Sequence, residues 1–153
     1  MHLKDLISEL GRELGLTNLI NGDHQAAELM FNNRIEVIIE PSLDGRAAHL
    51  HARIGELTAD TPVEVYRALL RGHLLAVATR GYCFTMMDHS DDLFLFRNFQ
   101  LDSTQPHDLV KALEDLVEVV EQWETYLENP TQEETTPEEP TAVVAHMPDL
   151  LQV

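Results

Sequence analysis

Residues 26–54, AAELMFNNRIEVIIEPSLDGRAAHLHARI, contain the pattern that decides the fold. Residues 34–40 and 46–54 alternate apolar and polar side chains, which is the period of a half-buried strand. Residues 26–31 form a shorter strand, and Asn32-Asn33 is typical of a tight turn because Asn tolerates a left-handed backbone. Three consecutive strands with short connections predict an antiparallel meander.

Two further strands follow at residues 82–87 and 93–101, joined by the loop DHSDD. The short polar connection predicts a hairpin. The run Leu93 to Phe96 is continuously apolar, so we expect this strand to be covered on both faces. Cys83 lies in the first strand of the hairpin, where we expect a buried and inert thiol.

Helical spacing of apolar residues predicts helices over residues 3–14, from Thr61 to about Thr79, and from Pro106 to about Glu128. Thr61-Pro62-Val63-Glu64 is a capping box with Pro at the first helical position. The order α-β-β-β-α-β-β-α predicts an α+β protomer with a twisted antiparallel sheet. The second helix is apolar beyond one stripe, so it needs a second packing surface, and a subunit interface in a homodimer is the candidate.

Composition narrows the classes of function. The chain has 153 residues, 27 Asp plus Glu against 10 Lys plus Arg, and a formal net charge of -17. Such a charge argues against nucleic acid or an anionic membrane as the main partner. No apolar run approaches the roughly 18 residues of a spanning helix, and one cysteine indicates a reducing compartment. We therefore expect a soluble protein with one domain over residues 1–128, followed by an acidic Pro/Thr/Glu linker and a short apolar segment over 129–153, without order of their own.

Two polar clusters leave a metal-dependent enzyme open as an alternative. His49 and His51 lie two apart on one strand face, and the loop 88–92 carries Asp88, His89, Asp91 and Asp92. Neither has a third ligand at a recognisable spacing, and a polar strand face and a plain turn explain them. We predict no enzyme, no metal and no cofactor.

Several segments resemble the class I type III secretion chaperones, the family of the Tir chaperone. Leu6-Ile7, Leu10-Gly11 and Leu14-Gly15-Leu16 are similar to its opening "LL..LG..LGL", and Ala48 to Leu57 is similar to "L.L.A.IG.LP". Leu69 to Leu75, LLRGHLL, stands where the family has "LL.ANLL", and the first hairpin strand ends in Asp88 where the family has "ALD". Gly72-His73 departs from the family's Ala-Asn, Thr58 replaces its Pro, and the tail is longer than in most members.

The resemblance implies a cytoplasmic bacterial chaperone, without enzymatic activity, that forms a homodimer largely through the second helix and the neighbouring strand. It implies binding of the N-terminal region of one or more secreted effectors in extended form, and presentation of the complex to the secretion ATPase. For the dimer interface we predict Tyr66, Leu69, Leu70, His73, Leu74 and Val77. For effector binding we predict that part of one apolar set stays exposed, namely Leu3, Leu6, Ile7, Leu10, Leu29, Phe31, Ile35, Val37 and Ile39.

Two alternatives stay open besides the enzyme. One is a protein-binding adaptor of the same fold that has no role in secretion, because fold alone does not determine function. The other concerns the tail: Ala142 to Val153 is apolar and could be an autoinhibitory plug or a docking peptide.

Overall fold

The sheet confirms the predicted meander and hairpin. A computed structural model describes residues 2–16, 20–21 and 26–130, so the predicted tail lies outside the described residues from 131 onwards. The strands of the described part are β1 (Ile20–Asn21), β2 (Ala26–Phe31), β3 (Ile35–Pro41), β4 (Ala47–Glu56), β5 (Cys83–Met86) and β6 (Asp92–Gln100). They form one antiparallel sheet in the order β1-β2-β3-β4-β6-β5. Asn32 and Asn33 both take the predicted left-handed backbone between β2 and β3.

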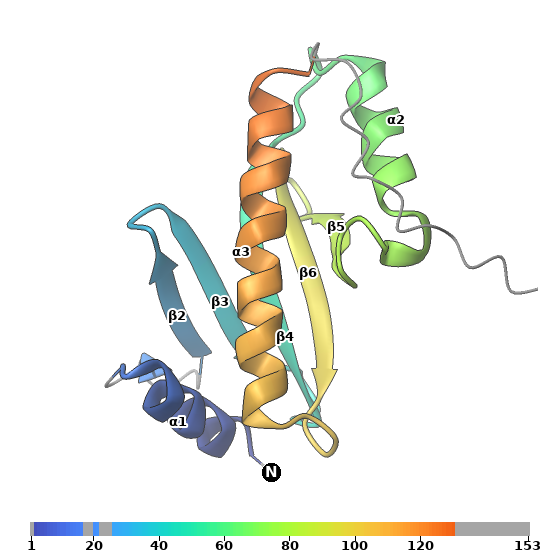
Figure 1. Cartoon of the computed structure of the whole chain (residues 1–153). Helices are drawn as coiled ribbons and strands as arrows, with labels where there is room; N and C mark the ends of the chain where they lie inside the picture. The colour runs from blue at the N-terminus through green and yellow to red at the C-terminus, as the bar shows by residue number, and fades with distance from the viewer. Residues whose placement is uncertain (1, 17–19, 22–25, 131–153) are drawn as a thin grey trace, which may run out of the picture.

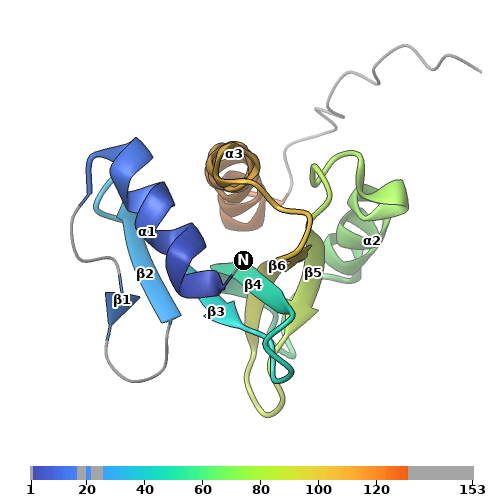
Figure 2. The same ribbon diagram turned by 90° about the horizontal axis from the view of Figure 1, so that it is seen from below.

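The helices are α1 (Leu3–Leu14), α2 (Val63–Gly72) and α3 (Pro106–Glu128), with the short 3-10 helix η2 (Leu74–Ala76) after α2. In Figure 1, α3 runs along the sheet and α2 stands beside β5. Figure 2 shows α1 and α3 on one side of the sheet and no described helix on the other, which we call the open face. The fold is thus a two-layer α+β domain with a peripheral α2.

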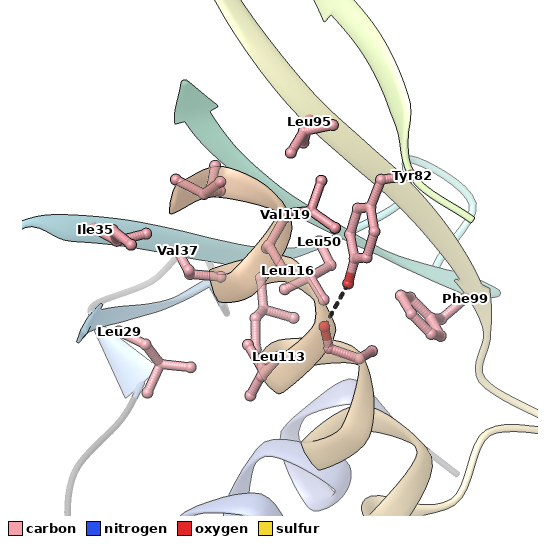
Figure 3. Close-up of a cluster of buried hydrophobic side chains, with 14 of the residues drawn as sticks. Leu29, Ile35, Val37, Leu50, Tyr82, Leu95, Phe99, Leu113, Leu116 and Val119 are labelled. Atoms are coloured by element: carbon pink, nitrogen blue, oxygen red, sulfur yellow. Dashed lines mark hydrogen bonds between the residues drawn. The ribbon is translucent and has the colours of Figure 1, made fainter. Parts of the chain in front are cut away.

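The core lies between the sheet and its two covering helices. In Figure 3, Leu113, Leu116 and Val119 of α3 face strand residues that include Val37, Leu50 and Leu95. All six side chains are buried. Tyr82 is fully buried in the same layer, and its hydroxyl donates a 2.8 Å hydrogen bond to the carbonyl of Ala112. Burial raises the pKa of the Tyr82 phenol because it disfavours the anionic form.

The second helix differs from its prediction at both ends. The Thr61 hydroxyl accepts from the amide of Thr58 at 2.9 Å, so it does not cap α2 and the predicted capping box does not form. The helix ends at Gly72 and not near Thr79. Beyond it, Leu75 and Ala76 take left-handed backbones, with φ of 54° and 53°, which turn the chain back towards β5.

The open face corrects two further expectations. Leu93 and Leu95 are buried beneath α3, but Phe94 and Phe96 lie half-buried on the open face, so β6 is not covered on both sides. Their rings pack beside His51 and His49, with centroids 6.0 Å and 5.2 Å apart. Cys83 is exposed and not buried, because β5 is an edge strand whose open side has no cover in the described part.

Candidate functional site

An apolar surface on α2 and η2 is the first candidate for binding a partner. We call it the α2 patch; its exposed members are Tyr66, Leu70, Leu74, Leu75 and Val77. Leu70 is 74% exposed and Leu75 is 86% exposed, so most of each side chain lies outside the packing of the protomer. Contiguous apolar surface of this kind on a globular domain marks a protein interface.

The predicted interface residues fall into two groups. Tyr66, Leu70, Leu74 and Val77 belong to the exposed patch. Leu69, in contrast, is buried in the core of its own protomer, and His73 is half-buried. The predicted set did not include Leu75. The prediction assumed a continuous helix, whereas the left-handed backbone at Leu75 turns its side chain outwards.

One close contact fixes where the α2 patch sits. At Gly72, an added Cβ would lie 2.5 Å from Cζ2 and 2.7 Å from Cη2 of Trp123 on α3. The Trp123 ring is itself held edge-on by Phe84, at 4.8 Å between centroids, and by Tyr126, at 5.6 Å. The missing side chain at Gly72 therefore lets the end of α2 lie directly on the aromatic cluster of α3 and β5.

The predicted effector-binding set is mostly interior. The structure buries eight of its nine members in the core between α1, the sheet and α3, namely Leu3, Leu6, Ile7, Leu10, Leu29, Ile35, Val37 and Ile39. Helical and strand periodicity places a side chain on the apolar face, but it does not say whether another element covers that face. Phe31 is the member of the set that keeps accessible surface, since it is half-buried at the end of β2.

The edge of the sheet at β2 is the second candidate. The two-residue strand β1 pairs with β2 only at Ala26 and Ala27, so no strand among the described residues pairs with β2 from Leu29 to Phe31 on its outer side. Met30 is 59% exposed there, beside the half-buried Phe31. An unpaired strand edge presents backbone donors and acceptors to an incoming strand.

Contacts with α3 hold the β2–β3 turn in place. The Asn32 side chain donates a 3.1 Å hydrogen bond to Glu121, and the Arg34 guanidinium pairs with Glu124 and Glu121. These contacts fix the turn against the last part of α3, so the edge belongs to an ordered sheet. No sequence motif marks this edge.

The polar clusters considered for an enzyme do not converge. His49 and His51 lie in the middle of β4, whereas Asp92, at the end of the 88–92 loop, pairs across the sheet with Glu56 at the end of that strand. Hydrogen bonds from Arg53 and Ser90 lower the pKa of Asp92. Within the described ranges, no three His, Cys, Asp or Glu side chains are grouped so as to hold a metal ion. Nor does any helix in those ranges have the length and apolar character needed to cross a membrane.

Comparison with protein families identifies the domain. The model of the Tir chaperone protein (CesT) family matches residues 5–124. The chain belongs to this family. The match begins in α1 and ends within α3, so this family's domain includes both candidate surfaces. Comparison with curated protein sequences gives no match.

Solved structures share the fold of this family member at low sequence identity. The HopA1–SchA chaperone–effector complex contains a chain 18% identical to this one, with a TM-score of 0.67, covering 80% of this chain and 92% of that chain. The structure of the Yersinia pestis type III secretion chaperone SycH, in complex with a fragment of YscM2, gives 19% identity and a TM-score of 0.64, covering 79% of this chain and 98% of that chain. YbjN of E. coli, described as a putative transcription regulator, is 13% identical with a TM-score of 0.54, covering 81% of this chain and 87% of that chain. These structures show the fold alone, and it is the family match that identifies this chain.

Proposed function

We propose that this chain is a chaperone of type III secretion. In this proposal it binds the N-terminal region of one or more secreted effectors in the bacterial cytoplasm, keeps that region extended and soluble, and presents the complex to the secretion ATPase. The observation that carries the proposal is the match to the Tir chaperone family over residues 5–124. It is supported by the fold shared with SchA and SycH, both in complexes with other proteins, and we assign the chain no enzymatic activity.

A homodimer through the α2 patch is part of the proposal. The patch exposes leucine, valine and tyrosine side chains that one protomer leaves in water. In a two-fold dimer the α2 patch of one protomer packs against the α2 patch of the other. The exposed apolar side chains of both protomers are then buried in one interface. Of the predicted interface, Leu69 and His73 then support the patch from beneath, while Tyr66, Leu70, Leu74 and Val77 make the contacts, together with Leu75.

For the client we propose addition of a strand at the β2 edge. An extended client segment would hydrogen-bond along Leu29 to Phe31, and its side chains would lie beside Phe31 and Met30. The eight buried members of the predicted set then form the core that supports this edge. Phe31 is the member of the set that contacts the client. Ordering an extended client costs conformational entropy, so a second contact area on the partner protomer would strengthen binding.

Net charge supports the same function. With a net charge of -17 on each chain, separate dimers repel one another and remain dispersed while they hold an apolar client. The adaptor alternative shares the fold and the surfaces, and differs from the proposal only in the identity of the client.

The test has two steps. A tagged chain is purified from its native bacterium under secretion-inducing conditions, and co-purifying proteins are identified by mass spectrometry. Each candidate is then co-expressed with the chain, with and without its N-terminal region, and secretion of the candidate is measured in a strain that lacks the chaperone. The proposal predicts a secreted client, bound through its N-terminal region, whose secretion falls in that strain. Clients that are never secreted would favour the adaptor.

A further inference from the structure

The C-terminal segment of this chain matches the α2 patch in its chemistry. We propose that residues 142–153 cover the α2 patch of their own chain before it dimerises, and leave the patch when a second copy takes their place. The chain then regulates the assembly of its own dimer. This inference rests on the dimer that belongs to the proposed function, and goes further because it assigns a role to the tail.

The last helix brings the start of the tail close to α2. The structure describes the chain as far as Pro130, two residues after α3 ends at Glu128. In Figure 1, α2 stands beside α3, and Gly72 at the end of α2 packs directly on Trp123 in the C-terminal half of α3. The tail therefore begins beside the helix that carries the patch.

The connection to the apolar segment is long enough to reach the whole patch. Residues 131–141, TQEETTPEEPT, separate Pro130 from that segment. Eleven residues of flexible chain span about 17–20 Å on average, and a proline-rich chain of this length extends to about 34 Å. The ten residues of α2 make a helix only about 15 Å long. Residues 142–153 can therefore lie along α2 without any movement of the domain.

The segment has the apolar side chains that cover such a patch. Residues 142–153, AVVAHMPDLLQV, contain six large apolar residues, namely Val143, Val144, Met147, Leu150, Leu151 and Val153. On the patch, Leu70, Leu74 and Leu75 are each at least 70% exposed. Docking removes apolar surface of both partners from water, which is the main favourable term in association of this kind.

Charge favours the tail as the occupant of this surface. Residues 131–153 contain no lysine or arginine and five acidic residues, namely Glu133, Glu134, Glu138, Glu139 and Asp149. The helix α2 carries two exposed arginines, Arg67 and Arg71. Arg67 is bonded to Glu64 at 2.8 Å, whereas Arg71 forms no hydrogen bond or ion pair with any residue that the structure describes. An acidic tail therefore finds an available cation next to Leu70.

Covalent attachment decides between the tail and a second copy. A segment on a short flexible linker meets its site at an effective concentration in the millimolar range. A second copy competes only at its own concentration, so at micromolar levels the tail occupies the patch even when it binds far more weakly. A higher concentration of the chain, or a client that bridges two protomers, shifts the balance to the dimer.

The first experiment measures the dissociation constant of the dimer for the full chain, by sedimentation equilibrium. If the tail covers the patch in half of the separate protomers, it weakens the dimer by about fourfold, because both copies must be uncovered. Leu150→Ser combined with Leu151→Ser should therefore tighten the dimer by at least about fourfold. Thr135→Ala combined with Thr136→Ala changes the tail outside its apolar segment and should leave the constant unchanged. A dimer that is unchanged or weakened by the leucine substitutions would overturn the proposal.

A double-mutant cycle tests the charge contact. Arg71→Gln should tighten the dimer by about twofold in the unmodified chain, because it removes an exposed ion pair with the tail. In the chain with Leu150→Ser and Leu151→Ser it should not, since the tail is already released. The comparison cancels any direct effect of Arg71 on the dimer, because that effect is present in both backgrounds. Equal effects in the two backgrounds would overturn the contact between Arg71 and the tail.

The second experiment locates the segment. Met147 is replaced by the photo-crosslinking residue p-benzoylphenylalanine, and a mixture of unlabelled and isotopically labelled full chains is irradiated below the dissociation constant of the dimer. Mass spectrometry then separates crosslinks within one chain from crosslinks between chains. We expect crosslinks to residues 63–77 of the same chain. Crosslinks only between chains, or only to other parts of the domain, would overturn the proposal.

The outcomes separate the inference from the function on which it rests. If neither the unmodified chain nor the leucine variant dimerises at any concentration, the proposed dimer is wrong, and the crosslinks alone decide whether the tail covers the patch. If both chains dimerise equally and no crosslink reaches α2, the inference is wrong and the dimer stands. The chaperone function itself is decided independently, by the secretion of clients that co-purify with the chain.

Discussion

Gly72 should resist substitution even by alanine. Its φ does not lie in the left-handed region, so the backbone accepts any residue, and the constraint is space. The new methyl carbon would lie 2.5 Å from Cζ2 of Trp123, well below a van der Waals contact. Phe84 and Tyr126 hold the indole from two other directions, so the ring cannot simply turn away.

Two opposing effects set the magnitude of Gly72→Ala. Alanine in a helix gains up to about 1 kcal/mol over glycine. Overpacking of a filled core costs about 1–3 kcal/mol, and a contact this short belongs in the upper part of that range. We expect a net loss of about 1–2 kcal/mol in the free energy of unfolding, and a fall in Tm of about 2–8 °C. Urea unfolding followed by far-UV circular dichroism, at one fixed protomer concentration, measures it.

The control for Gly72→Ala is the same change in a Trp123→Phe background. Phenylalanine lacks the two ring atoms that the methyl group would meet. In that background Gly72→Ala should be neutral, or stabilising by up to about 1 kcal/mol, so that the two sites couple by at least about 1 kcal/mol. Stabilisation of the unmodified chain by Gly72→Ala would refute the close packing of α2 on α3.

Three other changes test separate parts of the structure. Leu70→Asp should convert the dimer to a monomer with an unchanged circular dichroism spectrum, whereas Leu43→Asp, at an exposed turn, should not; light scattering distinguishes them. Tyr82→Phe should cost about 1–2 kcal/mol in urea, because the Tyr82 hydroxyl is buried and bonded to Ala112. Because the pKa of Tyr82 is raised in the folded state, its contribution is complete below about pH 10 and is lost above it, so Tyr82→Phe should flatten the alkaline fall in Tm. Arg34→Gln should cost less than about 1 kcal/mol, with the loss shrinking at high salt, and a larger cost would contradict an exposed ion pair.

Periodicity predicted the elements and their order because it reports which face of each element is apolar. The strands around Ile35 and Leu50 and the stripe of α3 from Leu109 to Trp123 lie as their patterns indicate. The same patterns gave no information about what covers a face. For this reason Leu3 and Val37 were candidates for a binding surface and are buried in the protomer. Phe94 and Cys83 were expected inside, but Phe94 lies on the open face and Cys83 on the edge strand β5.

The two ends of α2 could not be predicted from the sequence either. Thr61 and Pro62 fit a capping box, but the Thr61 hydroxyl has a competing donor in the preceding turn, the amide of Thr58. The LLRGHLL run continues the helical spacing, but the helix ends at Gly72 and the backbone reverses at Leu75 and Ala76. The first outcome depends on a local hydrogen bond within that turn. At the other end of the helix, Gly72 packs against Trp123 of α3, a contact between elements that local spacing does not report. Gly72 was visible in the sequence as a departure from the family's alanine. The structure explains the glycine, because Trp123 on α3 leaves no room for a side chain there.

The proposed chaperone acts as a dimer that holds a secreted protein. Native mass spectrometry of the tagged chain, purified from its own bacterium under secretion-inducing conditions, tests it most directly. We expect a complex of two copies of the chain with one secreted protein, and loss of that complex when the N-terminal region of the client is removed. Recovery of the chain as a monomer without a secreted client would contradict it.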